Sequence, residues 1–248
     1  MTDNIASLVG AVTREVRSVE RDGREARVVV ASRAYDTTIE DMWDAITNPE
    51  RIPRWFLPVT GELRLGGQYQ LVGNASGTIT GCEPPRHLAL TWEFGGEVTW
   101  VEVHLAPDPN GGTHLVLEHS AHVDDARWDQ FGPGAVGVGW DLGLLGLHWH
   151  ISGGSPLDTM ALQEWEVSED AKQYSRQSSE GWRRASIAWG TDESAATAAA
   201  DRTTAFYTGE GMEEPAADTA AGELAASGEP TDGQPADDGS NQDSATTA

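Results

Sequence analysis

Short apolar stretches with an alternating pattern fill the middle of the chain and predict an antiparallel sheet. Breaks rich in Gly, Pro and Asn separate them at Gly66-Gly67, Asn74–Gly77, Pro84-Pro85, Gly95-Gly96 and Asp108–Gly112. Hairpin-like connections at this spacing are typical of an antiparallel meander. We therefore expect a curved antiparallel sheet rather than a parallel one.

Residue parity within these stretches assigns one apolar and one polar face to the sheet. Successive strand residues point to opposite faces, so residues two apart share a face. The apolar face is predicted to carry Leu88, Leu90, Trp92 and Phe94, then Val101, Val103 and Leu105, and then Leu115, Leu117 and His119. The other face carries Glu93, Glu102 and Glu118. A sheet with one apolar face needs helices to cover it.

Periodic apolar residues before and after the sheet predict those helices. Thr37-Thr38-Ile39-Glu40 matches a capping box, and apolar residues at helical spacing follow it, which predicts a helix over 38–46. Asn48 and Pro49 are expected to start a short second helix. Further helices are expected at Gly134–Ile151 and Glu169–Trp189, which share the cover, and at Ser194–Phe206. Trp128 is placed in a loop before them.

Composition divides the chain into three parts. Residues 1–10 are expected to be a flexible N-terminus, and residues 11–34 a β-hairpin turning at Asp22-Gly23. Residues 11–208 are expected to form a single domain with a C-terminal helical extension. Residues 209–248 hold ten acidic residues, no Lys or Arg and no aromatic residue, so they cannot offset their ordering entropy and are predicted to be a disordered acidic tail.

The charge balance limits the partners. The tail contributes -10 to the net charge of -24, which leaves -14 on residues 1–208. Nucleic acid and anionic membrane surfaces are therefore poor partners. The tail is interpreted as a solubilising appendage, the alternative being recruitment of a basic protein partner.

Cysteine content and hydropathy indicate the cellular compartment. Cys82 is the single cysteine, which excludes an intramolecular disulfide and fits a reducing compartment. No segment reaches the roughly 18 uninterrupted apolar residues of a membrane span. We expect a soluble cytoplasmic protein, and the excess of Arg over Lys together with abundant Ala, Gly and Asp suggests a bacterial source.

The order of these elements resembles a known superfamily. Between Arg27 and His150 the carrying motifs are the Tyr35–Trp43 helix entry, Asn48-Pro49-Glu50 with Trp55-Phe56, Gly66-Gly67, Glu83-Pro84-Pro85-Arg86 with Leu90-Thr91-Trp92-Glu93, Gly112-Thr113 with Leu117-Glu118-His119-Ser120, and Gly139-Trp140. They resemble the START-like (SRPBCC) proteins, within them the relatives of the activator of the heat-shock protein 90 ATPase and the polyketide-cyclase-like proteins. The resemblance implies an α+β helix-grip fold, in which a curved antiparallel sheet of about six to seven strands packs on a C-terminal helix. The N-terminal hairpin and the additional C-terminal helices are expected as additions to that fold.

A helix-grip fold implies a cavity between sheet and helix, which leads to three functional hypotheses. The first is binding of a small hydrophobic or amphipathic ligand, because indoles offer large apolar surfaces with one N–H donor. The cavity lining is predicted to be Trp43, Trp55, Phe56, Leu90, Trp92, Val103, Leu117, His119, Trp140 and Leu144. The resemblance also implies two alternatives, a chaperone-ATPase-activator-like protein-interaction domain and a cyclase- or hydrolase-like enzyme.

Candidate chemistry in the sequence is sparse. His119 is the catalytic candidate, because its parity points it to the apolar face, but a histidine satisfied by its neighbours is the alternative. His148 and His150 diverge by about 200° on a helix, so we predict no metal site. Gly132–Gly137 matches G-x-G-x-x-G without the buried strand that dinucleotide binding requires. We expect no cofactor and no catalytic residue beyond that candidate.

Overall fold

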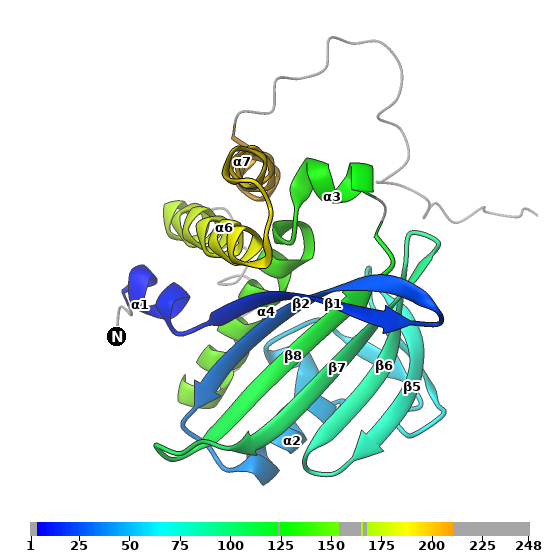
Figure 1. Cartoon of the computed structure of the whole chain (residues 1–248). Helices are drawn as coiled ribbons and strands as arrows, with labels where there is room; N and C mark the ends of the chain where they lie inside the picture. The colour runs from blue at the N-terminus through cyan, green and yellow to red at the C-terminus, as the bar shows by residue number, and fades with distance from the viewer. Residues whose placement is uncertain (1–3, 124, 154–164, 166–167, 211–248) are drawn as a thin grey trace, which may run out of the picture. The chain divides into compact units, whose positions relative to one another are not determined.

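One antiparallel sheet of eight strands organises the part of the chain that the structure describes (Figure 1). The computed structural model describes residues 4–123, 125–153, 165 and 168–210, all of them in one compact unit. The strands are β1 Thr13–Arg21, β2 Arg24–Tyr35, β3 Val59–Gly61, β4 Gln68–Leu71, β5 Ser76–Glu83, β6 His87–Phe94, β7 Glu97–Pro107 and β8 Thr113–Ala121. They lie in the order β1-β2-β8-β7-β6-β5-β4-β3. The acidic tail predicted over 209–248 lies, from residue 211 onward, outside the described residues.

The N-terminal hairpin is part of this sheet. Asp22 and Gly23 both adopt positive φ, 51° and 72°, as a two-residue hairpin turn requires. β2 pairs with β1 on one side and with β8 on the other. Because both arms of the hairpin join the meander, the sheet has eight strands instead of the expected six to seven. The predicted α+β helix-grip architecture is confirmed.

The helices largely follow the predicted pattern. They are α1 Ile5–Gly10, α2 Ile39–Thr47, the 3-10 helix η1 Ile52–Arg54, α3 Asp125–Phe131, α4 Gly134–Gly153, α6 Glu169–Trp189 and α7 Glu193–Thr208. Thr38, Ser168 and Asp192 cap α2, α6 and α7 by accepting a hydrogen bond from a first-turn backbone N–H. The short helix expected at Asn48-Pro49 begins instead at Ile52.

Two segments differ from the sequence-based expectation. Within the N-terminus expected to be flexible, Ile5–Gly10 form α1, whose Leu8 and Val9 are buried against Leu145 and Tyr174. Trp128, placed in a loop by the sequence, lies on α3 and is buried, and its ring packs against Trp189. The two helices have only six and seven residues, less than two turns each, which is too few to show an apolar period.

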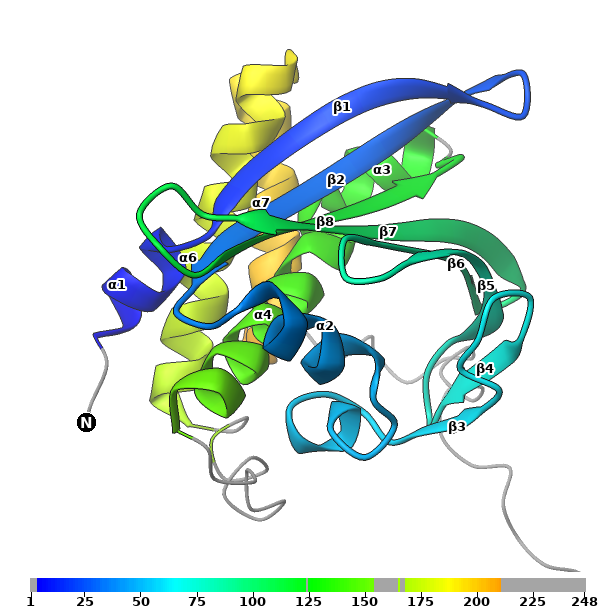
Figure 2. The same cartoon turned by 90° about the horizontal axis from the view of Figure 1, so that it is seen from below.

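Helix α4 covers the apolar face of the sheet, and α2 lies beside it on the same face (Figure 2). Glycines allow α4 to approach its neighbours closely. A Cβ at Gly146 would lie 2.4 Å from the backbone oxygen of Trp55, and one at Gly137 would lie 2.3 Å from the ring of Trp182. Gly137 also ends the G-x-G-x-x-G match, and here it lets α4 pack closely against α6.

Helix α6 lies next to α4 and along β1, and a buried hydrogen-bond network around one ion pair joins the three elements. The carboxylate of Asp141 on α4 is fully buried and accepts a hydrogen bond from Arg14 Nε of β1 at 2.8 Å. The same oxygen accepts from Trp182 Nε1 of α6 at 3.1 Å and from Ser178 Oγ of α6. This network fixes α6 as an outer layer over α4.

Candidate functional site

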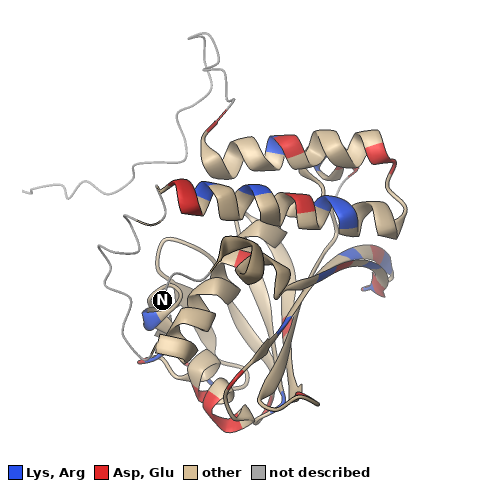
Figure 3. Cartoon of the chain, turned by 90° about the vertical axis from the view of Figure 1, so that its left-hand side faces the viewer, with Lys and Arg blue, Asp and Glu red and all other residues tan. Residues whose placement is uncertain are grey.

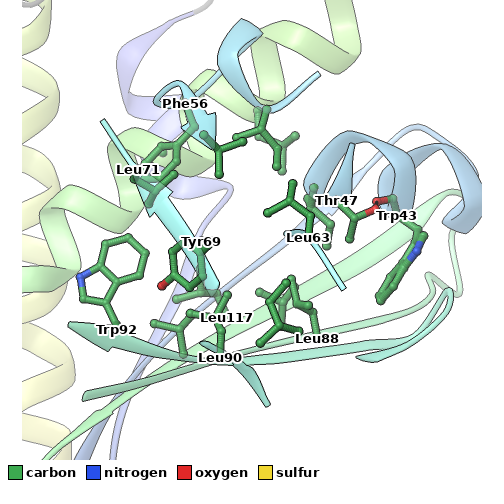
Figure 4. A pocket seen from close by; sticks show the side chains of 18 of the residues that line it. Trp43, Thr47, Phe56, Leu63, Tyr69, Leu71, Leu88, Leu90, Trp92 and Leu117 are labelled. Atoms are coloured by element: carbon green, nitrogen blue, oxygen red, sulfur yellow. Dashed lines mark hydrogen bonds between the residues drawn. The ribbon is translucent and has the colours of Figure 1, made fainter. Parts of the chain in front are cut away.

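A cavity of about 290 Å³ lies between the apolar face of the sheet and the helices α2, η1 and α4. Figure 4 shows Leu88, Leu90 and Leu117 rising from the sheet, with Phe56 and Leu71 on the opposite side and Trp43 and Trp92 at the two ends. The volume is about twice that of an engineered apolar cavity of roughly 150 Å³ that admits benzene. A small apolar molecule therefore fits it.

The lining contains most of the residues predicted for it. All of the predicted lining residues except His119 border the cavity: Trp43, Trp55, Phe56, Leu90, Trp92, Val103, Leu117, Trp140 and Leu144. Their neighbours there are Ile46, Thr47, Ile52, Val59, Leu63, Arg64, Tyr69, Leu71, Ile79, Cys82, Leu88, Val101, Leu115, Gly143 and Leu147. The sheet gives the floor, and α2, η1, α4 and the short strands β3 and β4 give the remaining walls.

Hydrogen bonds hold α2 against the segment that carries Trp55 and Phe56. The indole N–H of Trp55 donates to the carbonyl of Ala45 at 2.9 Å. Arg51 Nη1 lies 2.8 Å from Asp41 and 2.9 Å from Asp44, both on α2. Arg51 also reaches His150 of α4 at 3.2 Å. These contacts fix three walls of the cavity relative to one another.

Most of the polar side chains of the lining are already paired within the protein. The hydroxyl of Thr47 donates to the carbonyl of Trp43 at 2.6 Å, and that of Tyr69 donates to the carbonyl of Thr91 at 2.7 Å. The indole N–H of Trp140 donates to His119. The charged Arg64 is exposed and pairs with Glu62. The cavity surface is thus apolar, with a cationic side chain at its margin.

His119 lies behind this lining, in a continuous chain of hydrogen bonds that runs from Trp140 to the backbone of Trp92. Trp140 Nε1 donates to His119 Nδ1 at 2.9 Å, so Nδ1 is the acceptor nitrogen. Nε2 therefore carries the proton and donates to Thr99 Oγ1 at 2.8 Å, and Thr99 in turn donates to the carbonyl of Trp92 at 3.1 Å. Both ring nitrogens are used and the residue is 7% exposed. It faces a second hollow of about 170 Å³ rather than the main cavity.

This arrangement disfavours His119 as a general base. A base needs a lone pair within reach of the substrate proton, and the lone pair of Nδ1 is occupied by the indole of Trp140. Burial lowers the pKa of His119 from 6.5 to about 4, which keeps the ring neutral. The predicted alternative of a histidine satisfied by its neighbours describes the observed geometry.

The depressed pKa of His119 predicts a pH dependence of stability. Because the unfolded chain takes up a proton near pH 6.5 and the folded one near pH 4, the contribution is complete above pH 6.5 and is lost as the pH falls toward 4. The expected loss is about 3 kcal/mol, at about 1.4 kcal/mol per pKa unit. Urea unfolding of the native protein and of His119→Gln at pH 7 and pH 4.5 measures it. Carboxylates common to both proteins cancel, and equal pH profiles would contradict the prediction.

Apart from Arg64 at the margin, the residues that border the cavity are uncharged. Figure 3 shows Lys and Arg interspersed with Asp and Glu on α6, α7 and the β1–β2 hairpin, while α4 and the rest of the sheet are mostly uncharged. None of the helices among the described residues is both long enough and apolar enough to cross a bilayer.

A bent antiparallel sheet closed by a long helix, with an apolar hollow between them, defines a helix-grip protein of the START-like type. The comparisons with known proteins agree. Residues 36–147 match the family described as "Activator of Hsp90 ATPase homolog 1-like protein". The chain belongs to this family.

Two solved structures of one protein are similar over most of the described chain. The solution structure of CalU16 from Micromonospora echinospora is 33% identical with a TM-score of 0.61, covering 73% of this chain and 97% of CalU16. Its crystal structure is 32% identical with a TM-score of 0.57, covering 71% and 99%. The helix-grip fold is therefore shared over nearly the whole of CalU16.

A curated human relative shares a shorter region. "Activator of 90 kDa heat shock protein ATPase homolog 1" of Homo sapiens is 30% identical over 98 residues, which cover 36% of this chain and 28% of the human protein. The mouse protein of that name is 29% identical over the same length. The chain thus spans little more than a quarter of the length of these relatives.

Proposed function

We propose that the chain is a binding protein for a small, mainly apolar molecule held in the cavity between the sheet and α4. The observation that carries the proposal is a hollow of about 290 Å³ bordered by leucine, valine and aromatic side chains. A fold that only needed a core would gain stability by filling this space, because each unfilled cavity lowers stability. A hollow of this size between well-packed elements is better explained by an occupant.

The lining limits the chemistry of that occupant. Because the hydroxyls of Thr47 and Tyr69 already donate to backbone carbonyls, a ligand with many polar groups would lose its hydration without compensation. A ligand burying about 300 Å² of apolar surface would gain about 7.5 kcal/mol at about 25 cal/mol per Å², before association costs. An acidic or polar end of the ligand fits the margin at Arg64. The expected class is a small hydrophobic or amphipathic molecule.

The single cysteine supplies a direct test. Cys82 borders the cavity, and no other thiol exists in the chain. The probe is 1-anilinonaphthalene-8-sulfonate, an amphipathic dye whose fluorescence rises in apolar surroundings. We expect one dye per chain and a slower reaction of Cys82 with a small alkylating reagent when the dye is bound. Dye binding that leaves the alkylation rate unchanged, or no dye binding, would contradict the proposal.

The second candidate function is that of a chaperone-ATPase activator. It is favoured by the 30% identity to the human activator over 98 residues. The distinguishing measurement is ATP turnover by the 90 kDa heat-shock protein of the same organism, with this chain in molar excess. Increased turnover would support this candidate. Unchanged turnover together with dye protection of Cys82 would exclude the activator function and support the ligand-binding function.

A further inference from the structure

The convex face of the sheet, opposite the cavity, brings two histidines and a glutamate together. His87 of β6 and His104 of β7 are directly opposite each other in the antiparallel register. Glu102 precedes His104 by two residues, so its side chain lies on the same face. We propose that His87, Glu102 and His104 form a binding site for a zinc ion. The sequence-based prediction of no metal site rested on His148 and His150. His87 and His104 lie 17 residues apart in the sequence, and only the strand register brings them together.

The distances suit zinc. His87 Nε2 lies 3.3 Å and His104 Nε2 3.8 Å from the same oxygen, Oε2 of Glu102. Zinc binds His nitrogen and carboxylate oxygen at about 2.0–2.2 Å, so neighbouring ligand atoms of a tetrahedral site lie about 3.4 Å apart. All three ligand atoms lie within 4.8 Å of one another. To bind one ion, the two imidazoles would rotate out of their stack so that both Nε2 lone pairs point at it.

Neighbouring residues order these ligands. The two imidazole rings stack, with centroids 4.5 Å apart and planes inclined by 16°. Arg21 Nη1 lies 3.5 Å from the other carboxylate oxygen, Oε1 of Glu102. Arg21 is itself held by Ser120 Oγ at 2.8 Å and by the ring of Trp100 at 4.5 Å. Partners of this kind, which orient a metal ligand from behind, raise the affinity of metal sites.

Exposure and charge also favour a cation from solvent. The side chains of His87, Glu102 and His104 are 24%, 31% and 47% exposed, so an ion reaches all three. The chain carries a net charge of -24, which attracts cations. Two imidazoles and one carboxylate match zinc better than magnesium or calcium, which prefer oxygen ligands. A water molecule would complete the four-coordinate set.

The site is independent of the proposed ligand function, although the two share a wall. Leu88 and Val103 are opposite each other in the register, follow and precede the two histidines, and line the cavity. A zinc ion joining His87 to His104 would hold this strand pair together from the outer face. It needs no occupant of the cavity, so either proposal can fail alone.

The test is calorimetric titration of Zn²⁺ into the metal-free full chain, with His87→Ala, Glu102→Gln, His104→Ala and the control His148→Ala, which removes a histidine on α4. We expect one zinc ion per chain, affinity lowered at least tenfold in each of the three site variants, and wild-type affinity in the control. Co²⁺ should give the strong visible absorption of a tetrahedral site, lost in His104→Ala. No Zn²⁺ binding, or equal affinity in the wild type and the site variants, would overturn the proposal.

Discussion

Asp141→Ala is expected to lower the free energy of unfolding by about 3–5 kcal/mol, the usual cost of removing one partner of a buried ion pair. The side chain of Asp141 is 0% exposed and that of Arg14 is 7% exposed. Without the carboxylate, the guanidinium stays buried without its counter-charge, and the donors of Ser178 and Trp182 lose their acceptor. Whole domains are stable by only about 5–15 kcal/mol, so urea unfolding should show a large shift of the midpoint.

Two controls separate the buried charge from a general loss of contacts. Glu15→Ala removes an exposed partner of Arg17 on the same strand, where the side chains are 55% and 42% exposed, and should cost at most about 1 kcal/mol. The double variant Arg14→Met/Asp141→Ala removes the stranded charge and should recover part of the loss. A double variant less stable than Asp141→Ala would show that packing, and not charge, governs this site.

Local signals explain how far the fold could be predicted from the sequence. The expected helix Glu169–Trp189 has the observed bounds, because Ser168 caps its start and Gly190, with φ of 119°, ends it. The hairpin was predictable because Asp22-Gly23 is a turn pair that tolerates positive φ. Helices α1 and α3 were missed because tertiary burial of Leu8, Val9 and Trp128 stabilises them. A short window of sequence contains no information about such tertiary contacts.

The candidate site was predictable where the position of a residue within one strand decides which face its side chain lies on. It was not predictable where the contact depends on how two elements are aligned. Parity alone placed Leu90, Trp92 and Leu117 on the cavity side. Tyr69 and Leu71 were missed because β4 has only four residues, too few to show a pattern. For His119, parity gave the face but not the indole of Trp140 that occupies its nitrogen. Contacts between side chains of different elements require the register, which no single stretch of sequence encodes.

Leu90→Trp is expected to weaken binding of 1-anilinonaphthalene-8-sulfonate by at least about a hundredfold, which corresponds to about 2.7 kcal/mol. Leu90 rises from the floor of the cavity (Figure 4), so a larger side chain there occupies the space proposed for the ligand. The fold should tolerate the change, because the added atoms enter an existing hollow; overpacking of a filled core costs about 1–3 kcal/mol. Fluorescence titration gives the affinity and urea unfolding gives the stability.

Two matched variants make this result specific to the cavity. Val98→Trp adds an indole at a 51% exposed position of β7 and should leave dye affinity unchanged. Leu117→Ala enlarges the cavity and should keep dye binding while lowering stability by about 2 kcal/mol, the low end for a buried leucine, because one side of Leu117 already faces open space. Affinity and stability should therefore respond in opposite ways to filling and enlarging the hollow. Equal dye affinity in Leu90→Trp and Val98→Trp would mean that the dye binds elsewhere on the chain.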